Sequence, residues 1–233
     1  MRAISSMATR HVLADLLAAA EIAGLPAVEV ESVGGVDAAS RVADGEAFDL
    51  VFLASGALRK LADAGNVDSA TARSIVLSQV AVAVPSGSGE PALRPDGPAF
   101  ADAAELQATL RSASRIGYST GPSGTALVQM IDEWGLTDEV GDRLVQAQPG
   151  IPVAKSVAAG TVDLGFQQLS ELVGHPGIRI LGVMPDDCAI DTVFAGAVAT
   201  ASSSPAQAAE VLAFLASDDA AAIKTRHNFG IPA

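Results

Sequence analysis

Serine and glycine residues suited to holding an anion gather in the segment Ile-Gly-Tyr-Ser-Thr-Gly-Pro-Ser-Gly-Thr-Ala-Leu, residues 116–127. Its apolar start predicts a short buried strand, and Pro122 predicts the first turn of a helix just after it. Side-chain hydroxyls and the free backbone N–H groups of a helix start together bind negative charge. The candidate ligand contacts in this segment are Tyr118, Ser119, Ser123 and Gly124.

The same order, a predicted strand followed by small polar residues, occurs three more times near the N-terminus. The helix that follows each strand adds about half a positive charge to such a turn. The structural alternatives are helix-capping serines and, at the glycine pair, a plain turn. The candidate contacts here are Ser5, Ser6, Gly34, Gly35, Ser55 and Gly56.

Two adjacent glutamines, Gln167 and Gln168, follow a predicted strand at residues 162–166. A carboxamide donates hydrogen bonds to a carboxylate without carrying charge, which suits a polar ligand in a dry cleft. The alternative is a pair of residues that begin a helix. Ile151, in the turn Gly-Ile-Pro-Val at residues 150–153, is expected to present a further N–H group.

Signatures of catalysis are absent from the sequence, which lacks a Gly-x-Ser-x-Gly elbow, a P-loop and a dinucleotide fingerprint. The groups available for proton transfer are Tyr118, His11 and Arg59, of which Tyr118 is the catalytic candidate. The single Cys188 and three histidines without ligand spacing predict no metal and no cofactor. Whether the protein is an enzyme stays open at this point.

Composition narrows the class of protein and of partner. Hydrophobic residues make up 49% of the chain and aromatic residues only 4%, which favours parallel sheets covered by Ala-rich helices. The formal net charge of −13 argues against nucleic acid as a partner. Binding of an anion must therefore depend on local dipoles and a few basic groups such as Arg10, Arg41 and Arg59.

Export and membrane insertion are judged from the N-terminus and from apolar runs. No run of about 18 apolar residues occurs, so no membrane insertion is expected. Met1 and Arg2 lead straight into the first expected strand, without the basic and apolar regions of a signal peptide. We expect a cytoplasmic protein, or a periplasmic one if a leader peptide was trimmed.

Strands and helices alternate along both halves of the chain, which is typical of doubly wound α/β sheets. Two apolar stretches, 75–84 and 191–200, are long enough to cross from one domain to another. Strands are expected at 3–6, 27–33, 48–54, 114–118, 142–147, 162–166 and 178–183. Helices are expected at 9–23, 38–42, 55–61, 102–111, 123–134, 152–159, 168–173, 204–215 and 218–224, and a loop at 86–97.

The expected fold class is α/β, with two doubly wound lobes joined by a two-strand hinge. Lobe 1 would be discontinuous, from residues 1–80 plus 191–233, and lobe 2 would hold residues 81–190. Open α/β sheets bind ligands at the carboxyl ends of their strands. In a two-lobed protein these edges can face each other across a cleft.

Along nearly its whole length the chain resembles the type II periplasmic solute-binding proteins, in the branch that is like molybdate-binding proteins. The resemblance implies two α/β lobes and a ligand bound by serine hydroxyls and backbone N–H groups, here Ser5, Ser55, Ser123 and the turn at Ile151. The Phe-Gln-Gln-Leu-Ser-Glu-Leu segment at 166–172 differs from molybdate binders and is similar to aconitate isomerase. The matching segments are 4–6, 45–51, 118–124, 159–166 and 214–217.

The leading hypothesis is a protein that closes two lobes on a small carboxylate or oxyanion. An ABC permease would be its partner only if the protein is exported. The alternative, which the resemblance to aconitate isomerase implies, is a cytoplasmic isomerase. It would move a double bond in a small unsaturated polycarboxylate by proton transfer, with N–H groups stabilising the developing charge.

Overall fold

The structure, a computed structural model, describes residues 1–94, 97–148 and 151–232, which form two compact units. Unit 1 consists of Met1–Leu77 and Thr192–Ala233, and unit 2 of Ser78–Asp191. The chain leaves unit 1 within strand β4 (Arg73–Pro85) and returns at the start of β9 (Asp191–Val198). Each unit contains a sheet with helices on both faces, so the expected doubly wound α/β class is confirmed.

Three parallel strands form one side of the unit 1 sheet. β1 (Arg2–Ser6) lies between β2 (Glu29–Val33) and β3 (Leu50–Ala54) and runs parallel to both. β9 pairs antiparallel with β3, and β4 follows it in the sheet. Because β1, β2 and β3 run in the same direction, their carboxyl ends meet at one edge.

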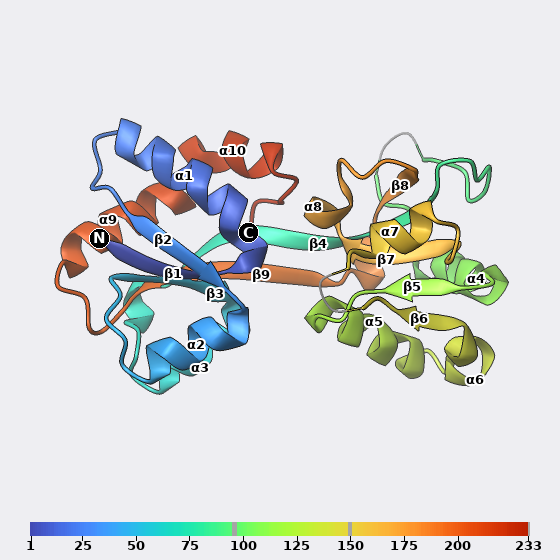
Figure 1. Ribbon diagram of the computed structural model, residues 1–233, viewed down its shortest axis with the longest axis horizontal. Helices are drawn as coiled ribbons and strands as arrows, with labels where there is room; N and C mark the ends of the chain where they lie inside the picture. The colour runs from blue at the N-terminus through green and yellow to red at the C-terminus, as the bar shows by residue number, and fades with distance from the viewer. Residues whose placement is uncertain (95–96, 149–150, 233) are drawn as a thin grey trace. The chain divides into compact units, whose positions relative to one another are not determined.

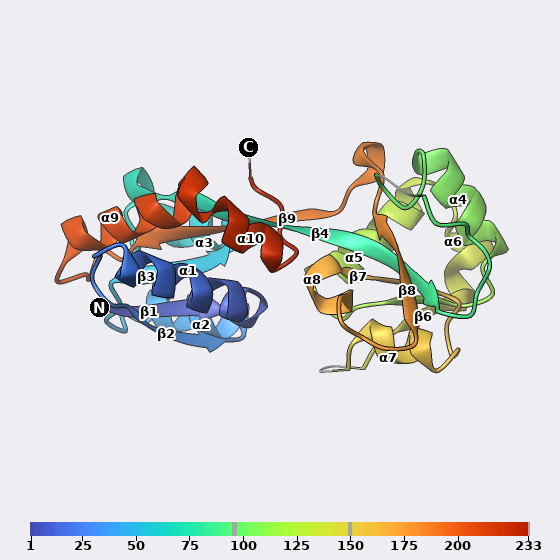
Figure 2. The same ribbon diagram turned by 90° about the horizontal axis from the view of Figure 1, so that it is seen from above.

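Alternating side chains on β1 and β3 build two separate cores in unit 1. Ala3, Leu50 and Phe52 pack under α1 (Arg10–Ile22), α9 (Pro205–Ala216) and α10 (Ala221–Arg226). Ile4, Val51 and Leu53 pack against α2 (Gly35–Ala43) and α3 (Ser55–Asp63) on the opposite face (Figure 1). Seen from above, α1 lies beside α9 and α10 (Figure 2). The continuous apolar sequence of β3 is thus explained by burial on both faces.

Unit 2 has the strand order β8-β4-β7-β5-β6, with β4 antiparallel to both of its neighbours. β5 is parallel to β6 and β7, so these three carboxyl ends also share an edge. On β4, Val80, Val82 and Val84 face one core, while Ala81 and Ala83 face the other. The strands are β5 (Ile116–Tyr118), β6 (Leu144–Gln146), β7 (Leu164–Gln168) and β8 (Ile178–Val183).

The helices of unit 2 divide between the two faces of its sheet (Figure 1). One face carries α4 (Ala103–Ser112), α5 (Pro122–Glu133) and α6 (Thr137–Val140), and the other carries α7 (Val153–Ala158) and α8 (Leu169–Leu172). Short 3-10 turns occur in both units, at Met7–Thr9, Ser69–Thr71, Gly141–Arg143, Asp186–Cys188 and Asp218–Ala220.

Three of the expected element bounds that differ from the structure have a local or a pairing reason. α2 begins at Gly35 rather than at residue 38, so the glycine pair lies at the helix start itself. The expected strand at 142–147 shrinks to β6 because Gly141–Arg143 forms a 3-10 turn. β7 extends through Gln168 because its last residues pair with Val80 and Ala81 of β4.

Two aspartates fix the starts of neighbouring strands in the two units. Asp49, just before β3, accepts hydrogen bonds from the Arg2 N–H at 3.0 Å and the Ser202 hydroxyl at 2.7 Å. Asp163, just before β7, accepts from the N–H groups of Ser114 at 2.8 Å and Arg115 at 2.6 Å. Both lie in segments that carry the family resemblance, which explains why those segments predict fold rather than ligand.

The contribution of Asp49 should be visible in the acid stability of the protein. Burial raises the Asp49 pKa, but the Ser202 hydroxyl and the Arg2 N–H outweigh it and hold the pKa below its ordinary 3.8. The folded protein therefore binds this proton less readily than the unfolded chain, and the stabilisation is lost as pH falls below about 4. We expect Asp49→Asn to cost about 1 kcal/mol at pH 7.

To test this role of Asp49, the melting temperatures of wild type and Asp49→Asn are measured between pH 6 and pH 2.5. The gap between wild type and Asp49→Asn should narrow as the pH falls. A gap of constant size would contradict the assignment.

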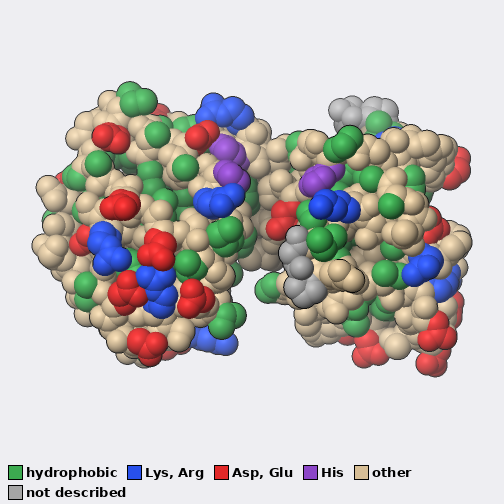
Figure 3. Space-filling view, viewed as in Figure 1, with side chains coloured by type: hydrophobic (Ala, Val, Ile, Leu, Met, Phe, Trp, Pro, Cys, Tyr) green, Lys and Arg blue, Asp and Glu red, His purple; other side chains and the backbone are tan. Residues whose placement is uncertain are grey.

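Ion pairs gather around Arg41 on unit 1, and Figure 3 shows acidic and basic side chains side by side on this unit. The Arg41 guanidinium contacts Glu31 at 2.6 Å and Glu46 at 2.7 Å, and it lies 5.5 Å from the Phe48 ring centre. Arg41 lowers the pKa of both carboxyl groups. Arg41, expected from sequence to help bind an anion, is thus engaged by two carboxylates.

Candidate functional site

The carboxyl edge of the unit 1 sheet brings together residues that are far apart in the sequence. Ser6 ends β1, and its Oγ accepts a hydrogen bond from the Ala8 N–H at 3.3 Å. The same Oγ lies 3.7 Å from the position that a Cβ on Gly35 would occupy. The turn after β1 and the start of α2 therefore meet.

The Ser5 side chain is fully buried, whereas the sequence predicted that it contacts a ligand. Its Oγ lies 2.8 Å from the Oγ of Ser32, which is its partner in the β1–β2 register. Sequence reasoning missed Ser32, since only the register between the strands reveals this pair. A ligand contact of Ser5 stays a prediction.

The starts of α2 and α3 leave backbone N–H groups free of side-chain caps. Gly34 and Ala54 are the N-cap residues, and within residues 1–94 neither helix start has a side-chain cap hydrogen bond. Ser55 is the first residue of α3 rather than its cap, so the capping alternative for Ser55 was wrong. A Cβ on Gly56 would meet no atom within 4 Å, so the first turn of α3 is open to an approaching ligand.

In unit 2 the Ser/Gly segment forms a tight turn between β5 and α5. The Ser119 and Ser123 hydroxyls lie 3.0 Å apart. A Cβ on Gly124 would lie 1.9 Å from the Ser119 carbonyl oxygen, so only glycine fits there. The same Cβ would lie 3.0 Å from the ring of the half-buried Tyr118. The four predicted contacts of this segment are therefore neighbours, and their contact with a ligand stays a prediction.

The amide of Gln167 is engaged by the protein itself. Gln167 is 6% exposed, its Oε1 accepts from the Val153 N–H at 2.8 Å, and its Nε2 donates to Glu171 Oε2 at 2.6 Å. Gln167 thus holds the start of α7 from the neighbouring strand. Gln168 is half-buried, ends β7 and precedes α8.

In the turn before α7, the backbone N–H of Ile151, predicted from sequence to contact the ligand, is already hydrogen-bonded within the protein. The Ile151 N–H donates to the Gln148 carbonyl at 2.9 Å, and the Ile151 side chain is exposed. The Ile151 N–H is therefore engaged in the turn. Gly150, part of the same predicted turn, lies outside the described residues.

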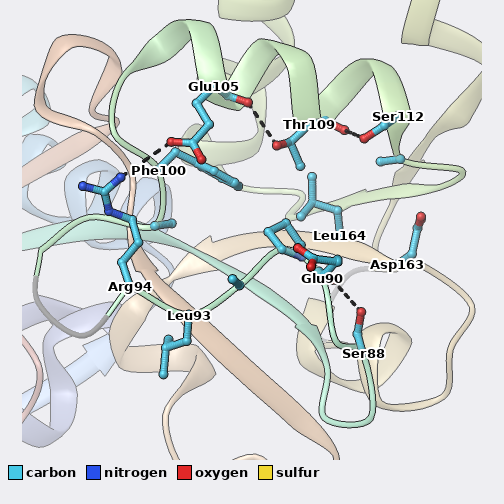
Figure 4. A pocket seen from close by; sticks show the side chains of 14 residues that line it. Ser88, Glu90, Leu93, Arg94, Phe100, Glu105, Thr109, Ser112, Asp163 and Leu164 are labelled. Carbon is cyan, nitrogen blue, oxygen red and sulfur yellow. Dashed lines mark hydrogen bonds and ion pairs between the residues drawn. The ribbon is translucent and has the colours of Figure 1, made fainter.

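A pocket of about 590 Å³ in unit 2 lies at the opposite edge of the sheet (Figure 4). Ala113 and Leu164 in its lining lie at the amino ends of β5 and β7. Arg94 and Glu105 form an ion pair of 3.6 Å here, and Asp163 accepts from the N–H groups of Ser114 and Arg115, just before β5. The pocket is thus separate from the carboxyl edge that carries the hydroxyl and N–H groups.

The two α/β units have the fold of the type II class of solute-binding proteins. The sequence matches the family of bacterial extracellular solute-binding proteins over residues 1–230, and the chain belongs to this family. In the described part of the chain, no helix has the length and apolar character needed to cross a membrane. The family description gives no support to the expected cytoplasmic location.

Among curated proteins, the chain is similar to an aconitate isomerase from Pseudomonas sp. The two are 34% identical over 182 residues, which cover 78% of this chain and 67% of that protein. The resemblance noted for residues 166–172 is thereby extended to most of the chain.

Two solved structures share the fold at low sequence identity. A domain from Clostridium difficile, described as the substrate-binding part of a molybdenum ABC transporter, aligns with a TM-score of 0.81 and 16% identity over 100% of this chain and 99% of its own. The periplasmic molybdate-binding protein of Azotobacter vinelandii aligns with a TM-score of 0.70 and 20% identity over the full length of both chains. At these identities the likeness establishes the fold alone.

Proposed function

We propose that this protein binds a small organic anion, a carboxylate, through uncharged donors at the carboxyl ends of its parallel strands. The observation that carries the proposal is the uncapped start of α3, where Ser55 and the open backbone at Gly56 follow β3. In unit 2 the Ser119 and Ser123 hydroxyls lie at the corresponding edge. That one ligand contacts both edges in a closing cleft stays a prediction.

A carboxylate fits better than an inorganic oxyanion for two reasons. The relative at 34% identity is named for aconitate, a tricarboxylate, whereas the molybdate-binding structures are at most 20% identical. In addition, two large apolar side chains flank the unit 1 donors. Met7 follows Ser6 and is 48% exposed, and Val36 in the first turn of α2 is 88% exposed. They give contacts to the carbon skeleton of a ligand that a bare oxyanion could not use.

The second candidate function is isomerisation of a small unsaturated polycarboxylate. The similarity to aconitate isomerase favours it, as does a carboxylate at the donor edge of unit 2, Glu171. Under both candidate functions, binding and isomerisation, the same uncharged donors bind the ligand. The two functions differ in whether a side chain at the carboxyl edge of the sheet moves a proton.

For location and partners, the family description favours an exported protein over a cytoplasmic one. An exported binding protein would deliver its ligand to an ABC permease. An isomerase would need no such partner, so the two readings also differ in what must surround the protein in the cell.

Ligand-induced thermal shifts test the proposed function directly. We expect citrate or aconitate at millimolar concentration to raise the melting temperature, because a ligand that binds only the folded state stabilises it by mass action. Molybdate, tungstate and sulfate should give smaller shifts. A shift with the inorganic anions alone would contradict the carboxylate assignment, and no shift with any of these anions would contradict anion binding.

A further inference from the structure

An acidic side chain stands among the neutral donors of unit 2. Glu171 lies in α8, directly after β7, and is therefore at the carboxyl edge together with Gln168 and Tyr118. Its carboxylate is exposed, and Oε2 accepts the hydrogen bond from Gln167 Nε2 at 2.6 Å. Among the described residues Oε1 has no protein partner, and no Lys or Arg forms an ion pair with Glu171.

Such a carboxylate opposes simple anion binding. Two like charges 4 Å apart repel by about 1 kcal/mol even in bulk water, and more where water is excluded. Three other carboxylates of this unit that lie near a strand or helix start are used structurally. Asp163 holds β5, Asp102 caps α4, and Glu105 accepts from the Ala101 N–H. Within the described part of unit 2, Glu171 has no comparable structural bond to the backbone.

The hydrogen-bond chain behind Glu171 holds its carboxylate in a defined orientation. The Val153 N–H donates to the buried Gln167 amide, and that amide donates to Glu171. A general base works best when a positioned neighbour holds one oxygen and leaves the other free for the proton. This arrangement matches that requirement, with Gln167 as the positioning residue.

We propose that Glu171 is a catalytic residue that moves a proton between two carbons of a small unsaturated polycarboxylate. The proposal rests on the proposed function, since the same donors must hold the substrate. Glu171 removes a proton from the carbon next to the double bond. The C–H electron pair becomes part of a conjugated dienolate, whose charge the neighbouring hydroxyl and N–H donors stabilise. Glu171 then returns the proton to the far end of the allylic system, so the double bond moves and no co-reactant is consumed.

The test follows trans-aconitate and other small unsaturated di- and tricarboxylates by NMR in D2O with the full-length protein. Wild type should produce the shifted isomer or incorporate deuterium at the allylic carbon. Glu171→Gln should slow this exchange at least 100-fold, while its thermal shift with the same anion stays equal or grows. Glu171→Asp, which keeps the carboxylate but shortens its reach, should retain part of the rate.

A matched control exists in α5, where Gln129 Nε2 donates to Glu133 Oε1 at 2.9 Å. This Gln–Glu pair has the same four-residue spacing, but Glu133 ends the helix and lies away from the strand carboxyl ends. Glu133→Gln should leave both exchange and binding unchanged. Equal losses in Glu133→Gln and Glu171→Gln would overturn the proposal.

Gln167 is tested by a readout that simple loosening of the fold would not move. Gln167→Met removes the amide that holds Glu171 Oε2, so kcat should fall while KM for the same polycarboxylate stays near its wild-type value. A kcat equal to that of wild type would contradict the positioning role.

The failures of the two proposals can be told apart. If wild type shows a thermal shift with polycarboxylates but exchanges no proton in any that bind, the Glu171 assignment is overturned and anion binding stands. If no carboxylate binds at all, the proposed function itself fails.

Discussion

Ser55→Asp is expected to abolish anion binding while unit 1 stays folded. Ser55 is the first residue of α3, and an acidic residue at a helix start stabilises the helix by about 0.3–1 kcal/mol. The same carboxylate would occupy the position where the ligand charge is proposed to lie. We expect at least a 100-fold loss of affinity, which corresponds to about 2.7 kcal/mol, in calorimetric titration with the anion that wild type binds.

Ser204→Asp is the matched control for this substitution. Ser204 precedes α9, a helix that likewise begins without a side-chain cap hydrogen bond within residues 151–232. Because β9 runs antiparallel to β3, the start of α9 lies at the opposite edge of the sheet. Ser204→Asp should bind like wild type. If Ser55→Asp binds the anion as tightly as wild type, the start of α3 is not part of the binding site.

Gly124→Ala is expected to cause the largest loss of stability among single substitutions at the candidate site. The added Cβ would lie 1.9 Å from the Ser119 carbonyl oxygen. This oxygen belongs to the backbone, so no side-chain rotation can relieve the clash. The turn between β5 and α5 must open, and we expect the free energy of unfolding to fall by about 3 kcal/mol. Chemical denaturation, followed by circular dichroism, measures this change.

Gly56→Ala provides the comparison, because its Cβ would meet no atom within 4 Å. The gain in helix propensity should leave the protein as stable as wild type or up to about 1 kcal/mol more stable. If Gly124→Ala proves as harmless as Gly56→Ala, the close approach in this turn is not a feature of the folded protein.

The order of strands and helices could be predicted because each buried face leaves a local pattern in the sequence. The Val/Ala alternation of β4 and the apolar run of β3 are visible without coordinates. The strand-end position of Ser6, Ser55 and Ser119 follows from the same pattern. The local sequence therefore predicted correctly at which edge of each sheet these polar residues lie.

The contacts within the site could not be predicted, because they depend on register and on pairing between distant segments. Gln167 was expected to follow a strand, but pairing with β4 keeps it in β7, where its amide holds Val153 and Glu171. Ser32 was missed because only the β1–β2 register places it beside Ser5. Glu171 was part of a recognised segment, but only the structure shows that no Lys or Arg of the described residues forms an ion pair with it.

Isothermal titration of the full-length protein with citrate, aconitate, molybdate and sulfate, each at low and high salt, tests the central claim most directly. If uncharged donors bind the ligand, a carboxylate should show saturable binding, and the affinity of the protein for it should change little with ionic strength. Absence of saturable binding by folded protein would contradict the account, and so would an affinity that collapses in salt.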